Sequence, residues 1–299
     1  MPRWTRDEQN AIRADAFRWL AEQMQAGKPS FTRQELAEYR FDGVRIPLVD
    51  QYGRGIRNPA DFEATLSIST SASSRRNPYA DEDLDGGMVR YDYRRGEGGD
   101  NIKLRRAAEF RVPLIYFKQI REAGPLVPVF PVYLIDDPVN RVVNVAMDEV
   151  LLFLSDPMHP SDLERRYVDR TVRARLHQPV FRARVISAYR TRCSICNLRH
   201  VELLDAAHIT PDGAPNGSAH VSNGVSLCKI HHAAYDQDLV GITPDYEVRV
   251  DEALLREVDG PMLRHGLQDM HGRRLELPSE KADWPDRDRL AERFAQFAA

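Results

Sequence analysis

Three cysteines and a histidine form the densest group of metal-type ligands in this sequence. Cys193 and Cys196 make a CxxC pair, and after a gap of 31 residues Cys228 and His231 make a CxxH pair. Two short ligand pairs separated in this way are typical of a tetrahedral structural zinc site, with thiolate sulfurs and one imidazole nitrogen as ligands. The spacing therefore predicts that these four residues bind Zn²⁺.

Two further histidines and an asparagine, His208, Asn223 and His232, are interleaved with the zinc ligands. Hydrolysis of a phosphodiester needs a general base to activate water and a divalent metal to neutralise developing charge. Histidine suits the base role because its unperturbed pKa lies near ~6.5. We predict His208 as the base and His232 as a ligand of the catalytic metal. Asn223 precedes Gly224, and we expect its side chain to close a long loop by hydrogen bonds to the backbone.

Two carboxylates are candidates for completing the ligands of the catalytic metal. Asp205 lies three residues before His208, which on a strand places the two side chains on opposite faces. Asp236 lies four residues after His232, which on a helix places them on the same face. Either carboxylate could supply a hard oxygen ligand to Mg²⁺ or Mn²⁺, and the sequence leaves this choice open.

The elements that must position these residues are a β-hairpin beginning in Val201–Ile209 and a helix from His232 to Asp236. From about Arg173 to Gly241 the sequence resembles the HNH, or ββα-metal, nuclease domains of bacterial restriction endonucleases. The resemblance rests on the motifs LDAAHITP, from Leu204, and NGVSLCKIHHAAYD, from Asn223. It implies a hairpin and helix around one divalent metal, with His208 as base, Asn223 as loop-ordering residue and His232 as ligand. Ala207 departs from the pattern, because many members carry a carboxylate or histidine there.

Length, charge and cysteine usage limit the class of protein. A chain of 299 residues favours two domains. The net charge is −3, but residues 161–192 carry nine arginines and three acidic residues, a local basic segment. Arginine outnumbers lysine 37 to 5, which indicates either phosphate recognition or a genome-wide composition bias. All three cysteines fall in the predicted zinc site, and neither a leader nor a long apolar stretch is present, so we expect a cytoplasmic protein without membrane insertion.

The N-terminal half is predicted to be a β-rich domain with a helical cap. Residues Thr5–Gly27 have apolar residues at helical spacing, and Thr32 begins a capping-box pattern. From Val44 to about Phe153, short apolar runs alternate with turn residues, which favours a β-barrel or sandwich with a helix starting at Asn101. A helix interrupted by Pro179 is expected to follow, and after the nuclease-like segment two helices, over residues 251–260 and 286–297.

An acidic loop, residues 71–87, with Tyr79 in it and Tyr91 and Tyr93 shortly after it, suggests how this half could read DNA. A carboxylate can accept a hydrogen bond from cytosine N4, and aromatic rings can stack on a base pulled from the duplex. Residues 44–140 weakly resemble the SRA domain, a base-flipping module that binds 5-methylcytosine, through Asp83-Leu-Asp85-Gly-Gly and Tyr91. The resemblance implies a modified-base pocket formed by Tyr79, Asp81, Asp83, Asp85 and Tyr91. The alternative is a solvated acidic loop beside core tyrosines.

These observations predict an α+β fold. We expect an N-terminal helical cap over residues 1–43, an SRA- or PUA-like β-barrel reader over 44–155, a basic helical linker over 156–185, a zinc-containing ββα-metal domain over 186–255 and its C-terminal extension over 256–299. The expected partner is double-stranded DNA with modified cytosine, and cleavage of both strands with one site per chain suggests a homodimer. The alternatives are an HNH endonuclease that reads unmodified sequence or another modification such as a phosphorothioate, and a zinc module that binds DNA without cleaving it.

Overall fold

The computed structural model describes residues 4–51, 54–70, 88–93, 98–121, 124–154, 161–212, 214 and 217–298. The chain forms two compact units, residues 1–180 and residues 181–299, each of which has its own hydrophobic core. None of the helices in the described ranges is long and apolar enough to cross a membrane.

The N-terminal unit begins with a long helix whose start is encoded by Thr5. The Thr5 hydroxyl accepts a hydrogen bond from the Glu8 backbone N–H, and the Glu8 carboxylate accepts from the Thr5 backbone N–H, a complete capping box. Thr32 and Glu35 make the same arrangement at the second helix. Both predicted helix starts are therefore confirmed. The helices of this unit are α1 (Arg6–Gln25), α2 (Arg33–Ala37), α3 (Gly99–Glu109), the 3₁₀ helix η3 (Glu149–Phe153) and α4 (Asp162–Val172).

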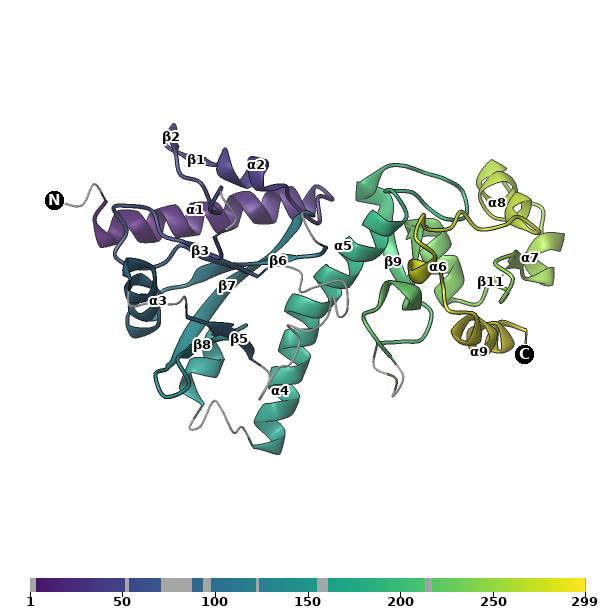
Figure 1. The fold of residues 1–299 in the computed structure, drawn as a ribbon. Helices are drawn as coiled ribbons and strands as arrows, with labels where there is room; N and C mark the ends of the chain where they lie inside the picture. The colour runs from purple at the N-terminus through teal and green to yellow at the C-terminus, as the bar shows by residue number, and fades with distance from the viewer. Residues whose placement is uncertain are drawn as a thin grey trace. The chain divides into compact units, whose positions relative to one another are not determined.

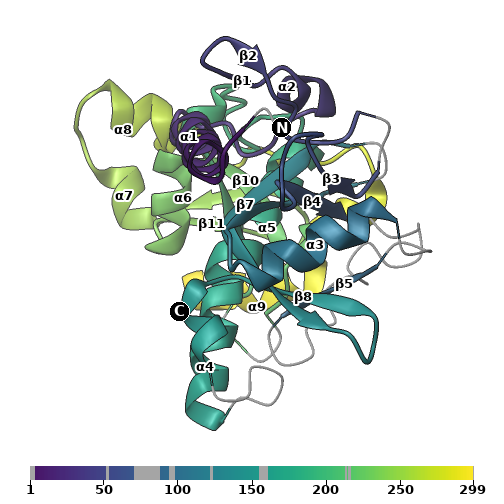
Figure 2. The ribbon, with the colours of Figure 1, turned by 90° about the vertical axis from the view of Figure 1, so that its left-hand side faces the viewer.

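A six-stranded sheet, in the order β3-β4-β6-β7-β8-β5, forms the centre of the N-terminal unit. Its pairings are antiparallel except for the parallel pair β4 and β6. Strand β6 is wholly buried and most residues of β7 are buried, and both α1 and α3 pack against β7 (Figure 1). Figure 2 shows α1 nearly end-on beside the sheet. The strands of this unit are β1 (Arg40–Phe41), β2 (Val44–Arg45), β3 (Ile56–Arg57), β4 (Ser67–Thr70), β5 (Val89–Asp92), β6 (Leu114–Gln119), β7 (Leu126–Asp137) and β8 (Val142–Ala146).

The predicted barrel is not confirmed. In the part of the chain that the structure describes, β3 and β5 form the two edges of the sheet and do not pair with each other. The first of the short apolar runs expected from Val44 onward contributes only the two-residue strand β2, which pairs with β1 in a separate ribbon. The alternating pattern identified strands correctly, but whether a sheet closes depends on pairings between distant strands, which no local pattern encodes.

The helical segment around Pro179 differs from the prediction. We expected Pro179 to interrupt the helix, but α4 is followed directly by a π-helical turn, η4 (Arg173–His177), and then by α5 (Gln178–Ala188). Proline lacks a backbone N–H and its ring conflicts with the carbonyl of the preceding turn. The wider π-helical turn immediately before Pro179 accommodates that conflict, so helical structure continues.

The C-terminal unit is a hairpin and helix with further elements around them. The hairpin strands are antiparallel, with His208 opposite Gly224 and Leu204 opposite Cys228. Its core gathers residues from α5 and from all the later strands. The helix predicted over residues 286–297 is present as α9, whereas only residues 252–256 of the range predicted over 251–260 are helical, as α7. The elements are η5 (Val201–Leu203), β9 (Leu204–His208), η6 (Val221–Asn223), β10 (Gly224–Cys228), α6 (Lys229–Asp236), β11 (Val240–Ile242), β12 (Val248–Val250), α7 (Glu252–Arg256), α8 (Pro261–Gly266), η7 (Gln268–Met270), η8 (Lys281–Asp283) and α9 (Arg287–Phe297).

Candidate functional site

The four predicted zinc ligands converge in the C-terminal unit. The ligand atoms of Cys193, Cys196, Cys228 and His231 all lie within 4.8 Å of one another. The Cys196 and Cys228 sulfurs are 3.9 Å apart, and the His231 Nδ1 atom is 3.1 Å from the Cys228 sulfur and 3.5 Å from the Cys193 sulfur. Two sulfurs bound to a tetrahedral zinc at about 2.3 Å each are separated by about 3.8 Å. The cluster therefore has the dimensions and the donor chemistry of a structural zinc site.

Backbone contacts fix the zinc-type cluster from two directions. The His231 Nε2–H group donates to the Gly266 carbonyl at 2.8 Å, which leaves Nδ1 as the free nitrogen facing the sulfurs. On the other side, the Ser194 N–H donates to the Ser226 carbonyl at 2.8 Å, joining the CxxC turn to β10. Because Cys228 ends β10 and His231 lies in the first turn of α6, an ion here would join the hairpin, the helix and the CxxC turn.

His208 ends strand β9 with its imidazole against an aromatic ring. The His208 and Phe181 ring centroids are 3.9 Å apart and their planes differ by 12°. Burial lowers the pKa of His208, and the Asp212 carboxylate opposes this only in part. The imidazole is therefore neutral near pH 7, the protonation state in which it can accept a proton.

Asn223 is wholly buried and joins the two ends of the loop between β9 and β10. Its Nδ2 group donates to the carbonyls of Thr210, at 3.0 Å, and Ser218, at 2.9 Å, while its Oδ1 atom accepts from the Thr210 N–H at 2.9 Å. The Asn223 carbonyl also accepts from the Ile209 N–H at 2.9 Å. These contacts hold the chain immediately after His208. Because the Asn223 side chain is wholly buried, it orders the loop and is not open to solvent.

His232 lies between two carboxylates on the exposed side of α6. Its Nδ1 atom is 3.4 Å from Asp205 Oδ2 and its Nε2 atom is 3.4 Å from Asp236 Oδ2. The hydrogen bond to Asp205 raises the pKa of His232, although burial opposes the shift. Burial raises the pKa of Asp205, but hydrogen bonds from His232 and the Ala206 N–H outweigh it and lower this pKa to about 2. Asp205 is thus a permanent carboxylate beside an imidazole.

The two candidate carboxylates are not equivalent. Asp205 and Asp236 approach different nitrogens of the same imidazole, so they do not converge on one point. Ligands of a small divalent ion at about 2.1 Å lie about 3 Å apart, and both carboxylates lie 3.4 Å from a His232 nitrogen, so distance does not distinguish them. Asp205 is also 34% exposed against 57% for Asp236, and is held by a second partner, Arg182. Asp205 is therefore the less exposed carboxylate beside His232 and the one that a second side chain holds.

Two residues of α5 belong to this site, although we did not predict them from the sequence. Phe181 stacks on His208, and the Arg182 Nε–H group is 3.3 Å from Asp205 Oδ1. Arg182 Nη2 also donates to the Leu204 carbonyl at 2.8 Å, the first residue of β9. The arginine-rich composition of residues 161–192 was a signal for Arg182. No local signal identified Phe181, because an aromatic residue in a helix usually indicates core packing.

Most of the predicted modified-base pocket, Tyr79, Asp81, Asp83 and Asp85, lies outside the described residues. Tyr91 is described, and it sits on β5 with only 9% of its surface exposed. Its hydroxyl packs so closely over Gly55 that a Cβ atom built there would lie 2.4 Å away. Tyr91 is therefore part of the packed sheet in this structure.

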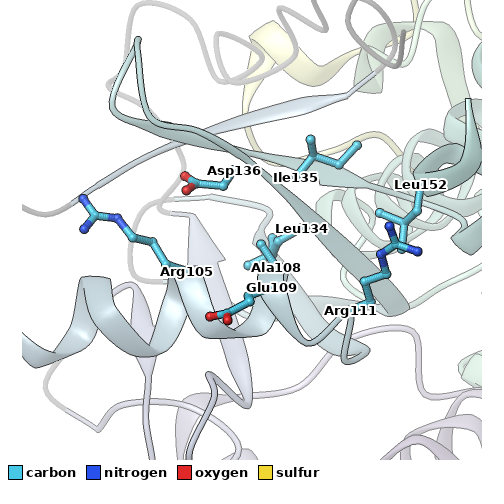
Figure 3. A pocket seen from close by; sticks show the side chains of 8 residues that line it. All are labelled: Arg105, Ala108, Glu109, Arg111, Leu134, Ile135, Asp136 and Leu152. Carbon is cyan, nitrogen blue, oxygen red and sulfur yellow. The ribbon is translucent and has the colours of Figure 1, made fainter. Parts of the chain in front are cut away.

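The N-terminal unit also contains a pocket of about 510 Å³ between α3, β7 and η3, formed by Arg105, Ala108, Glu109, Arg111, Leu134, Ile135, Asp136 and Leu152 (Figure 3). Two of its charged groups, Asp136 and Arg105, already contact Tyr93. Asp136 accepts a hydrogen bond from the Tyr93 hydroxyl, and the Arg105 guanidinium lies over the Tyr93 ring, 5.0 Å from its centroid. Burial, reinforced by the bond to Asp136, raises the pKa of Tyr93.

Comparisons with known proteins bear on the C-terminal unit. Residues 193–243 match the model of a family described as HNH endonuclease, and this range contains all four zinc-type ligands together with His208, Asn223 and His232. No curated protein matches the chain. A solved structure described as a modification dependent TagI restriction endonuclease aligns with 89% of this chain and 90% of its own, at 15% identity and a TM-score of 0.30. The family match identifies an HNH endonuclease domain within the C-terminal unit.

Proposed function

We propose that this protein is a DNA endonuclease that hydrolyses phosphodiester bonds at the site formed by His208, Asn223, His232 and Asp205. The observation that carries the proposal is that a neutral histidine, a loop-ordering asparagine and a carboxylate–imidazole pair occur together within an HNH endonuclease domain. An inert zinc module would need only the four-ligand cluster and has no use for this second set of polar residues.

In the proposed reaction His208 removes a proton from the attacking water. Asn223 fixes the loop that follows His208, which keeps the end of β9 in place. Asp205 and His232 would hold a divalent ion, Mg²⁺ or Mn²⁺, and when bound this ion supplies positive charge against the phosphate oxygens and the leaving group. Arg182 keeps the Asp205 carboxylate turned toward His232. The expected products carry 5′-phosphate and 3′-hydroxyl ends.

We further propose that the substrate is double-stranded DNA with modified cytosine, read by the N-terminal unit by base flipping. The support for this part is the SRA-like sequence between residues 44 and 140 and its acidic, tyrosine-containing loop. A homodimer, with each subunit nicking one strand, follows from one nuclease site per chain.

A paired digest tests both parts of the proposal. Matched plasmids with and without 5-methylcytosine are incubated with the full chain and Mg²⁺ or Mn²⁺, and His208→Ala serves as the control. We expect cleavage of the methylated plasmid only, and none by the variant. Equal cutting of both plasmids would remove the modification reader but keep the nuclease. No cutting of either plasmid, with DNA binding intact, would leave a zinc-containing binding module.

A further inference from the structure

Among the described residues, a stacked ring and no hydrogen bond restrains the His208 imidazole. In the part of the chain that the structure describes, neither ring nitrogen of His208 has a hydrogen-bond partner, although a general base must be held within about 0.5 Å and 10–20° of its working geometry. Rotation about the side-chain bonds would otherwise turn the nitrogens away from the attacking water. Some other contact must supply this restraint.

Phe181 supplies it by covering one face of the imidazole. The centroid separation of 3.9 Å and the angle of 12° describe two nearly parallel rings in van der Waals contact. A ring covered on one face cannot rotate out of its plane without separating from its neighbour. Both nitrogens lie in that plane, so they remain accessible at the ring edge, where a water molecule can approach.

The Phe181 ring is itself firmly placed. It is 2% exposed and belongs to the core of the C-terminal unit. The next residue, Arg182, donates to the Leu204 carbonyl at the start of β9, while Phe181 contacts His208 at its end. The same turn of α5 therefore fixes both ends of the strand that carries the base.

Gly224 explains how the Phe181 ring can approach His208. Gly224 is the direct cross-strand partner of His208. A Cβ atom built on Gly224 would lie 2.7 Å from Phe181 Cζ and 2.6 Å from Val185 Cγ2, far inside contact distance. The backbone of Gly224 is extended, with a φ of −133°, which any residue can adopt. Space for the aromatic ring, and no special backbone conformation, therefore requires glycine at this position.

We propose that Phe181 is a positioning residue that holds the His208 imidazole in its working orientation, and that Gly224 provides the space in which Phe181 does so. This inference rests on the proposed role of His208 as the base.

The first test replaces the ring and compares it with a neighbouring core contact. In Phe181→Leu the helix keeps an apolar side chain but loses the stacked ring, and we expect kcat for the methylated plasmid to fall by about 10- to 100-fold with little change in KM, the size of effect that misplacing a reacting group has. Val185→Ala removes another contact of the same helix with Gly224 and keeps the Phe181 ring on His208. We expect that variant to retain kcat within about threefold, because it only creates a small cavity.

The second test fills the space at Gly224. We expect Gly224→Ala to lower kcat about as much as Phe181→Leu, because displacing the ring and removing it have the same consequence for His208. Gly241→Ala is the matched control, since its Cβ would lie 2.5 Å from a ring atom of Phe297, a similar aromatic clash in the same unit. We expect this control to lose stability but to retain kcat while it is folded.

A double-mutant cycle isolates the contact with the ring. In a Val185→Ala background, which removes the other clash, Gly224→Ala and Phe181→Leu should be non-additive, with the double variant no slower than Phe181→Leu alone. Additive losses would overturn the proposed reason for glycine.

A spectroscopic measurement separates this inference from the nuclease proposal. Protons of an imidazole stacked under a benzene ring are shifted upfield in NMR spectra, and His208→Ala identifies the His208 signals in the full chain. We expect the upfield shift in wild type and its loss in Phe181→Leu. An inactive wild type with a shifted His208 signal would refute the nuclease and leave the stacking intact. An active wild type whose kcat is unchanged by Phe181→Leu would overturn the inference.

Discussion

Substitutions of Asn223 test whether its hydrogen bonds hold the loop that follows His208. The side chain is fully buried and makes three hydrogen bonds, one as acceptor from the Thr210 N–H and two as donor to the Thr210 and Ser218 carbonyls. Asn223→Ala removes all three and leaves one N–H and two carbonyl groups of the loop without partners. Asn223→Asp keeps nearly the same shape and the acceptor bond, but places an oxygen against the two carbonyl oxygens.

The expected magnitude follows from these contacts. Three neutral hydrogen bonds at about 1 kcal/mol each, with some added cost for the unpaired backbone groups, give a destabilisation of about 3 to 5 kcal/mol for Asn223→Ala. For a unit of this size we expect the melting temperature of the C-terminal unit to fall by about 10 to 15 °C. Asn223→Asp should be at least as destabilising at neutral pH, because a buried carboxylate then faces two carbonyl oxygens.

Thermal unfolding of the full chain, followed by calorimetry, measures these differences. The control is Ser222→Ala, at the adjacent position, where the wild-type hydroxyl has no hydrogen bond in the described structure; we expect it to stay within about 0.5 kcal/mol of wild type. The pH dependence of Asn223→Asp has a definite sign. Burial raises the folded-state pKa of the introduced carboxyl above its unfolded value, so its deficit against wild type is smallest below the unfolded pKa and grows as pH rises through the folded pKa.

One outcome would refute the reasoning. If Asn223→Asp melts within 2 °C of wild type, on the order of less than 1 kcal/mol, at neutral pH, the amide does not donate to the two carbonyls and the loop is held by other contacts. If instead both variants lose stability but cleave DNA at the wild-type rate at a temperature where they are folded, Asn223 stabilises the fold without positioning His208.

Three further predictions concern other parts of the molecule. Cys193→Ser should lower the zinc content measured by mass spectrometry and destabilise the C-terminal unit, because zinc binding is coupled to folding; unchanged zinc content and melting temperature would contradict the four-ligand site. Arg182→Met should cost about 1 to 3 kcal/mol of stability, since it removes the partly exposed ion pair with Asp205 and the hydrogen bond to the Leu204 carbonyl, while weakening Mn²⁺ binding measured by calorimetry; unaltered Mn²⁺ affinity would remove Arg182 from the site. Arg13→Met should destabilise the N-terminal unit by about 2 to 4 kcal/mol in urea unfolding, because the buried Arg13 donates to the Pro113 and Ala64 carbonyls, and retained stability would show that water replaces it.

Two helix starts and the zinc-type cluster could be predicted from the sequence, because each depends on short-range chemistry. The Thr5 and Thr32 capping boxes depend on residues three apart, and the structure contains both. The two short ligand pairs, each within one turn of chain, predicted a cluster whose four ligand atoms the structure brings within 4.8 Å. In each case the residues that must meet are close in sequence, or are brought together by a recurrent motif whose spacing fixes its geometry.

The tertiary structure alone decided the contacts between distant segments. Whether the N-terminal sheet closes depends on pairing between β3 and β5, which are 32 residues apart at their nearest ends. The differences between Asp205 and Asp236, in exposure and in the contact with Arg182, depend on packing that their spacing from His208 and His232 does not encode. Phe181 could be recognised as a contact of His208 only after α5 was packed on the hairpin. Sequence spacing encodes geometry within one helix or strand. Packing between elements depends on how side chains from the whole core fit together, and the order of residues along the chain does not specify that fit.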